Sequence, residues 1–324
     1  FTVTTLYLVY QQIKILTDIA FIKIKNFSKI NRVFQKSGDL LSRIDQKRWL
    51  FISAVMIIAI LSSVVQLQLT SPGMGISGDS VHYLEGAKNL ASGKGYSLEI
   101  SEGDPEPITG FEPVYSALLA AGIRYGAQGQ QFARLLTTVL NLMTMIMVGW
   151  IIYKTTNRVV PAVLGTGFVF LSPLILNIYA WAMSEPVFIV FLLGSTLAWA
   201  WHIKKPTIWR TLLTGVIASL MINTRFAGII FLATFVLLTL SLEKSKFLRR
   251  LRNATVMGLA GVIPYAVFFI RNLIMAKPSS GTEAASLGVF PKDYWEILGQ
   301  EVSSWFKWQK YFNYPHQRYN ALFV

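Results

Sequence analysis

The sequence predicts an all-α polytopic membrane protein, a bundle of transmembrane helices with a long first outer loop that carries interfacial helices. Of the 324 residues, 53% are hydrophobic and 14% are charged, whereas soluble domains carry about 25% charged residues. Several apolar runs approach the length of about 20 residues that a helix needs to cross a bilayer. The net charge of +14 is concentrated before the first run and in short links, as in cytoplasmic flanks. This distribution argues against nucleic acid binding as the reason for the basic charge.

The two ends of the chain are expected to lie outside the helix bundle. Residues 1–49 read as a basic leader at the cytoplasmic face, either an amphipathic helix on anionic lipid or a poorly ordered segment. Residues 277–324 are rich in Trp and Tyr and read as an outer interfacial loop. The first residue is Phe1, the first methionine is Met56, and Ala321 to Val324 begin another apolar stretch. We therefore expect the chain to be a fragment.

Residues 50–276 are expected to form about seven spans. The first, Leu50 to Leu69, has no charged residue and would reach about 30 Å as a helix. Basic residues before it and acidic residues after it place its N-terminus in the cytoplasm. Splitting 211–242 into two short helices, with Asn223 to Arg225 at an outer turn, keeps the basic stretch Lys244 to Arg252 on the cytoplasmic side. The remaining spans are expected at Phe132 to Tyr153, Val159 to Ile178, Pro186 to Trp201 and Ala254 to Leu273.

The outer loop, residues 70–131, holds many of the acidic residues. Apolar residues at helical spacing predict an interfacial helix over 80–92, and Pro113 to Ile123 is too short to cross and reads as a second one. The loop also contains G-x-G-x-x-G, ending at Gly78. A dinucleotide-binding fingerprint needs a strand directly before its glycines, whereas a long apolar run precedes these glycines. We therefore exclude a dinucleotide-binding motif here.

The expected topology brings five ionisable residues from separate parts of the chain to one membrane face. They are Asp79, Glu112, Glu185, Arg225 and Arg271. Ionisable groups near membrane depth are costly and usually serve function. Guanidinium groups bind phosphate oxygens in a bidentate manner, and a carboxylate accepts a proton from an attacking hydroxyl. The set therefore suits a substrate that bears a phosphate.

Each of these residues also has a simpler structural interpretation. Asp79 lies at or next to the N-cap of the 80–92 helix, and Glu185 before Pro186 also suits a helix start. Arg225 and Arg271 would then extend to lipid headgroups, and His82 would be interfacial surface. The residues alone leave both interpretations open.

A series of motifs resembles one membrane family. The first is G-D-S-V-H-Y-L-E-G-A-K-N-L-A-S-G-K-G-Y-S, starting at Gly78. The others are E-P-V-Y-S-A-L-L-A at 112–120, F-A-R-L-L at 132–136, S-P-L-I-L at 172–176, M-S-E-P-V-F at 183–188, T-R-F-A-G at 224–228 and P-Y-A-V-F-F-I-R-N at 264–272. In this order they resemble the GT-C membrane glycosyltransferases, in particular bacterial relatives of protein O-mannosyltransferases and of the lipid A aminoarabinose transferase (glycosyltransferase family 39-like). The resemblance covers about residues 50 to 280.

The resemblance implies an inverting glycosyltransferase of the bacterial cytoplasmic membrane. It would move a sugar from a polyprenyl-phosphate donor to a hydroxyl of a protein, lipid or glycan at the periplasmic or extracellular face. Asp79 would be the catalytic base, and Arg225 and Arg271 would bind the phosphate leaving group. The remaining residues that would contact substrate are Glu112, Glu185, His82, Tyr83 and Asn272.

Direct transfer needs no organic cofactor, and the sequence has no D-x-D motif, so we expect no obligatory metal ion. The chain departs from some relatives in having Asp79-Ser80 rather than two adjacent acids, and in Pro113 to Ser116, where a second proline is common. These departures bear on the subfamily and the substrate.

Two other functions stay open: a transporter or flippase of a lipid-linked sugar, which the lack of an internal repeat disfavours, and a non-catalytic membrane scaffold.

Overall fold

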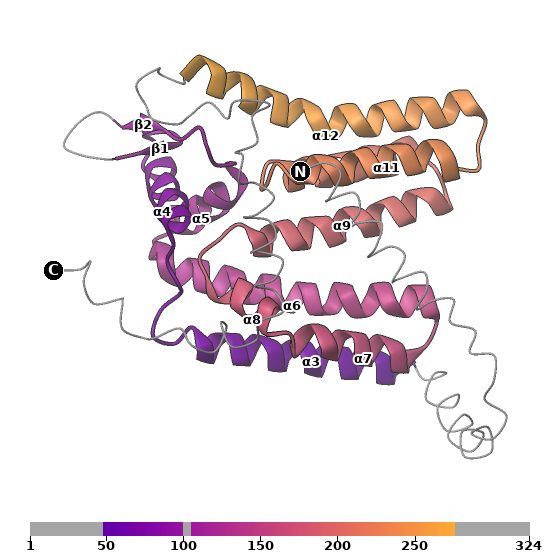
Figure 1. The fold of residues 1–324 in the computed structure, drawn as a ribbon, viewed down its shortest axis with the longest axis horizontal. Coiled ribbons are helices and arrows are strands. Elements are labelled where there is room, and N and C mark those ends of the chain that lie inside the picture. Colours follow the sequence, from indigo (N-terminus) through magenta and orange to yellow (C-terminus); the bar gives the residue numbers. More distant parts are fainter. Residues whose placement is uncertain (1–47, 100–104, 276–324) are drawn as a thin grey trace, which may run out of the picture.

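The computed structural model describes residues 48–99 and 105–275, and this part of the chain is almost entirely helical. Long helices lie side by side and alternate in direction, while shorter elements gather at one end (Figure 1). The bundle contains α3 (Arg48–Leu69), α6 (Gly129–Thr156), α7 (Val159–Phe170), α8 (Pro173–Ala180), α9 (Glu185–Lys204), α10 (Ile208–Ile222), α11 (Gly228–Leu242) and α12 (Phe247–Met275). At its end lie α4 (Gly78–Ala91), β1 (Ser97–Leu98), β2 (Glu106–Pro107) and α5 (Val114–Arg124). The expected leader and the expected C-terminal loop fall almost wholly outside the described residues.

Four described helices, α3, α6, α9 and α12, are long and apolar enough to cross a membrane. A fifth span is possible if α7 and α8 form one, but they are bent by 57°. The expected continuous run from Val159 to Ile178 was wrong in this respect, because Pro173 cannot continue the preceding helix. The described part is therefore a mostly helical candidate membrane protein, and the count of about seven spans depends on α7 with α8, α10 and α11.

The two-helix interpretation of residues 211–242 agrees with the structure. α10 and α11 are separate helices of 15 residues each, joined by a turn that contains Arg225. α10 packs against α9 and α12, and α11 packs against α12. At about 1.5 Å per residue, each helix is about 22 Å long, shorter than the hydrocarbon core of about 30 Å.

The beginning of α12 differs from the expected link. The basic stretch that starts at Lys244 was expected to precede the last helix, whereas the helix begins at Phe247 and includes most of these residues. Their long side chains do not interrupt a helix, since Arg and Leu are good helix formers. Pro264 also lies inside α12.

The outer loop contains both expected helices, now placed at 78–91 and 114–124. It also contains a short antiparallel pair, β1 with β2, that was not expected. Before α4, the backbone of Gly75 pairs with the link before α9: its N–H donates to Ala180 O at 2.9 Å, and Ala182 N–H donates to Gly75 O at 3.0 Å. A Cβ atom on Gly75 would meet the Trp181 ring at 2.6 Å. This glycine of the G-x-G-x-x-G pattern thus allows a close chain approach.

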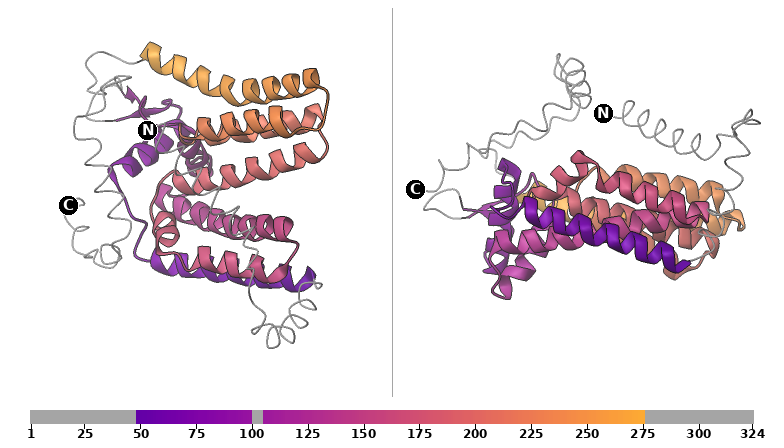
Figure 2. Two further views of the ribbon diagram at one scale, coloured as in Figure 1. Left: turned by 45° about the vertical axis from the view of Figure 1, so that its right-hand side comes forward. Right: turned by 90° about the horizontal axis from the view of Figure 1, so that it is seen from below.

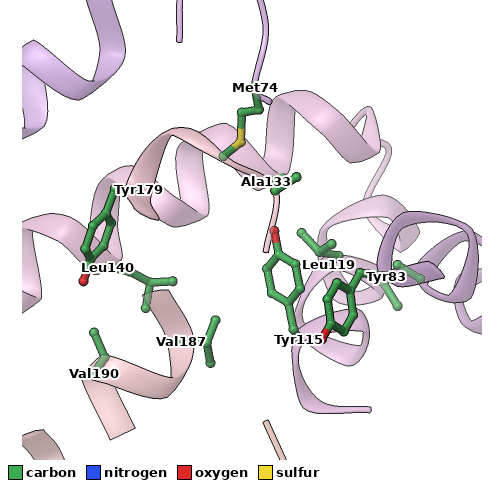
Figure 3. Packing of buried hydrophobic residues seen from close by; sticks show 12 residues of the cluster. Met74, Tyr83, Tyr115, Leu119, Ala133, Leu140, Tyr179, Val187 and Val190 are labelled. Carbon is green, nitrogen blue, oxygen red and sulfur yellow. The ribbon is translucent and has the colours of Figure 1, made fainter. Parts of the chain in front are cut away.

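The largest buried cluster joins the outer loop to the bundle. Tyr83 of α4 and Tyr115 of α5 lie beside each other in it, with ring centroids 5.2 Å apart and an edge-to-face geometry (Figure 3). Leu140 of α6 and Val187 of α9 belong to the same cluster. Burial of these side chains fixes α4 and α5 against the start of α9, where the candidate site lies.

The two ends of the bundle differ in charge. The end that carries α4 and α5, which we call the α4–α5 end, is visible in both further views (Figure 2). It holds every acidic residue of the described part except Glu243. The opposite end, here the basic end, carries the links α6–α7, α9–α10 and α11–α12 with their Lys and Arg residues. This alternation agrees with the sides assigned to these links from charge alone.

Candidate functional site

The candidate site is built around an ion pair between two links at the α4–α5 end. Arg225, in the α10–α11 turn, places Nη1 2.7 Å from Glu185 Oε1 in the first turn of α9. The same Nη1 donates to Ser184 Oγ at 3.3 Å. The side chain of Arg225 is 39% exposed, and that of Glu185 is 27% exposed. Among the described residues, Nε and Nη2 of Arg225 have no partner, so they can still donate to an anion.

Tyr83 connects this ion pair to α4. Its hydroxyl lies 3.0 Å from Ser184 Oγ, and its backbone carbonyl accepts a hydrogen bond from Ser116 Oγ of α5 at 3.0 Å. Burial raises the pKa of Tyr83 to about 12, although Ser184 and Arg225 oppose the shift. Tyr83 therefore stays protonated at neutral pH and acts as a hydrogen-bonding link.

Glu112 holds the α10–α11 turn from the opposite side. Its Oε1 accepts the N–H of Phe226 at 2.9 Å, and the nearby N–H of Val114 donates to Asn223 O at 3.1 Å. Burial raises the pKa of Glu112, while the hydrogen bond from Phe226 and the charge of Arg225 partly offset the effect. The turn that carries the arginine is thus fixed by the start of α5, and Glu112 is a full member of the site.

Asp79 lies in the first turn of α4, but the cap belongs to another residue. Ser77 is the N-cap, and it forms a reciprocal capping box with Ser80. The interpretation of Asp79 as the capping side chain was therefore wrong. Its carboxylate is exposed and accepts no side-chain or backbone hydrogen bond in the described part of the chain. A carboxylate that is exposed and has no described partner can contact a substrate hydroxyl directly.

His82 lies one turn after the start of α4. Its Nδ1 is 2.9 Å from the carbonyl oxygen of Gly78, so Nδ1 carries the hydrogen. The ring stacks on Phe111 at a centroid distance of 4.6 Å. In the neutral ring, Nε2 is then an acceptor. A substrate contact of His82 stays a prediction.

Arg271 and Asn272, at the end of α12, bind the outer loop. Arg271 Nη1 donates to Ile108 O at 2.8 Å, and Nη2 donates to Tyr96 O at 2.9 Å. Asn272 Nδ2 donates to Thr109 O at 2.9 Å. Much of the hydrogen-bonding capacity of Arg271 is therefore used by backbone carbonyls. Its expected contact with a phosphate stays a prediction that rests on the remaining donors.

Three residues of this arrangement were missed from sequence: Ser184, Ser116 and Tyr96. Ser184 stands in the quoted M-S-E-P-V-F motif, directly before Glu185, so its position gave a signal that the sequence reasoning did not use. Ser116 Oγ donates to the carbonyl oxygen of Tyr83, and the carbonyl oxygen of Tyr96 accepts from Arg271. Both residues also stand in quoted motifs, but no spacing in the sequence indicates a contact with a backbone carbonyl.

Two buried oxygen atoms near the ion pair have no protein partner in the described part: Glu185 Oε2 and Tyr115 Oη. Unpaired buried polar atoms are uncommon in folded proteins. The described residues contain no group of three or more His, Asp or Glu side chains that could hold a metal ion. The expectation of no obligatory metal remains a prediction.

Comparison with known proteins gave no match. No family model, no curated protein and no solved structure is similar to this chain at a significant level.

Proposed function

We propose that this protein is an inverting glycosyltransferase that uses a sugar linked to polyprenyl phosphate and transfers it to a hydroxyl acceptor. The observation that carries the proposal is the linkage of four sequence-distant segments at one end of the bundle. Tyr83 of α4, Ser184 and Glu185 of α9, and Arg225 of the α10–α11 turn form one chain of contacts. Glu112 fixes the same turn.

The proposed reaction assigns roles to Asp79, one helical turn before Tyr83 on α4, and to Arg225. The Asp79 carboxylate takes the proton of the acceptor hydroxyl, whose oxygen then attacks the anomeric carbon. The bond between that carbon and the phosphate oxygen breaks, and polyprenyl phosphate leaves with the electron pair. The free N–H groups of Arg225 would stabilise the additional negative charge on the leaving phosphate. Glu185 would hold the guanidinium in place.

The experiment compares release of polyprenyl phosphate from a polyprenyl-phosphate sugar by the full-length wild type and by Asp79→Asn. Glu85→Gln is the matched control, because Glu85 is also an acid of α4 and, among the described residues, pairs with Lys88 alone, at 3.5 Å. We expect Asp79→Asn to lose at least about 100-fold in turnover, the usual contribution of a general base, and Glu85→Gln to lose little. Undiminished turnover in Asp79→Asn would refute the base assignment. Movement of the donor across vesicles without release of polyprenyl phosphate would favour a transporter.

A further inference from the structure

A buried polar cluster joins four helices at the basic end, far from the candidate site. His202 Nε2 of α9 lies 3.0 Å from Glu243 Oε2, and His202 Nδ1 lies 3.3 Å from Thr211 Oγ1 of α10. Asn253 Nδ2 of α12 donates to both Glu243 oxygens at 3.1 Å, and Ser245 Oγ donates to Oε1 at 2.6 Å. The side chains of His202 and Glu243 are 0% exposed. The cluster therefore holds the α9–α10 link next to the α11–α12 link.

Two arginines, in the first turns of α10 and α12, donate to consecutive backbone carbonyls of the α9–α10 link. Arg210 Nη1 donates to Trp201 O at 2.9 Å and to Lys205 O at 3.2 Å, and its guanidinium lies 3.9 Å from the Trp201 ring centroid. Arg249 Nη2 donates to Pro206 O at 2.8 Å. Both guanidinium groups are thus fixed at the same short link and keep further donors available.

No described acidic side chain pairs with the charges of this surface. In the described part of the chain, none of the Lys and Arg residues of the basic end forms an ion pair with an acid, and the one acid there, Glu243, is fully buried. Two guanidinium groups held at the same short link concentrate positive charge there, and such a site attracts anions. Exposed apolar side chains adjoin them, namely Trp209, Phe247 and Leu248. Positive charge beside exposed Trp and aliphatic residues is typical of contact with lipid headgroups.

We propose that Arg210 and Arg249 form a site for the phosphate of an anionic phospholipid in the leaflet at the basic end. The phosphodiester accepts hydrogen bonds from both guanidinium groups, while Trp209 and Phe247 contact the upper part of the acyl chains. The cationic surface matches a lipid in three ways: the charge is complementary, the apolar residues lie beside the charge, and the neighbouring helix α12 is long enough to cross a membrane. The site lies at the opposite end from the candidate active site and does not depend on the proposed glycosyl transfer.

The test uses full-length protein in detergent and native mass spectrometry with phosphatidylglycerol and phosphatidylcholine of equal chain length. We expect the wild type to retain phosphatidylglycerol in preference to phosphatidylcholine. Arg210→Gln with Arg249→Gln should weaken retention of phosphatidylglycerol by about tenfold or more, because both substitutions remove charge-assisted hydrogen bonds to the lipid phosphate. The matched control is Lys154→Gln with Arg158→Gln, which removes two charges of the same end, one from the last turn of α6 and one from the α6–α7 link. The control should change retention by less than about threefold, because these side chains are not part of the proposed site and exposed charges are screened by salt.

Equal losses in the two double variants would overturn the proposal, because a general charge effect would then explain the binding. Unchanged retention in the Arg210 and Arg249 variant would overturn it as well. If the double variant does not fold, hydrogen exchange of the wild type provides an independent test. Hydrogen exchange in nanodiscs should show stronger protection of residues 204–210 with phosphatidylglycerol than with phosphatidylcholine, and equal protection would contradict the site.

Discussion

The ion pair between Arg225 and Glu185 gives the most direct prediction about the candidate site. Replacing Arg225 with Gln removes the 2.7 Å contact and leaves both Glu185 oxygens without a described partner, since Oε2 has none already. Exposed pairs contribute about 0.2–1 kcal/mol, whereas breaking a buried pair costs about 3–5 kcal/mol. The side chains here are 39% and 27% exposed, so we expect Arg225→Gln to lower the free energy of unfolding by about 1–2 kcal/mol.

A double-mutant cycle isolates the contact. Arg225→Gln, Glu185→Gln and the double variant are unfolded reversibly in mixed micelles, and the three losses of unfolding free energy are compared. We expect a coupling energy of about 1 kcal/mol. Additive losses within about 0.3–0.5 kcal/mol would refute the ion pair. Arg225→Lys serves as the control for charge, because lysine keeps the charge but not the planar set of donors. If Arg225 binds the phosphate as proposed, Arg225→Lys should lower turnover strongly while it lowers the free energy of unfolding only slightly.

Three further changes test the surroundings of the site and the basic end. Burial raises the pKa of Glu112, so ionisation of Glu112 at neutral pH lowers the free energy of unfolding. Glu112→Gln can still accept the N–H of Phe226 and should therefore be more stable than the wild type at neutral pH. This difference should disappear as the pH falls towards about 4, where the wild-type carboxyl group becomes protonated. A pH-independent difference in unfolding free energy would contradict this account. Gly215→Ala would place a Cβ atom 2.8 Å from the backbone oxygen of Met257, and we expect a loss of about 1–3 kcal/mol in unfolding free energy; a neutral effect would contradict the close approach of α10 to α12. Glu243→Ala leaves two buried donors unpaired, His202 Nε2 and Asn253 Nδ2. It should cost about 3 kcal/mol or more in unfolding free energy, and a loss below about 1 kcal/mol would argue against the buried cluster.

The helices were predictable where length and charge agreed. The run after Leu50 is apolar for about 20 residues, so a helix was the only way to satisfy its backbone in lipid. The division of 211–242 followed from the basic stretch after Lys244, and α10 and α11 agree with it. The bend before Pro173 was missed although the proline was visible, because hydropathy alone does not report where a helix stops. The β1–β2 pair has two residues in each strand, too few for a periodic pattern.

The site was predictable only as a set of residues at one face. Alternating topology brought Glu185 and Arg225 to the same side, and the structure pairs them directly. Sequence could not reveal that Arg271 binds the carbonyls of Tyr96 and Ile108, because backbone acceptors exist at every residue and leave no pattern. Sequence also left capping by Asp79 open, because Ser77 and Asp79 are both good capping residues and the choice depends on where α4 begins.

The lengths of the helices indicate the depth of the ion pair. α12 has 29 residues and would extend about 43 Å, whereas α10 has 15 and would extend about 22 Å from the same end of the bundle. The α10–α11 turn with Arg225 therefore lies closer to the basic end than the last turn of α12 does. The start of α5 contacts this turn through Glu112 and Val114. An ion pair at such a depth is screened less by water than one at the surface. The same arrangement leaves Asp79 exposed and places Arg225, the proposed phosphate ligand, where water screens its charge less than at the surface.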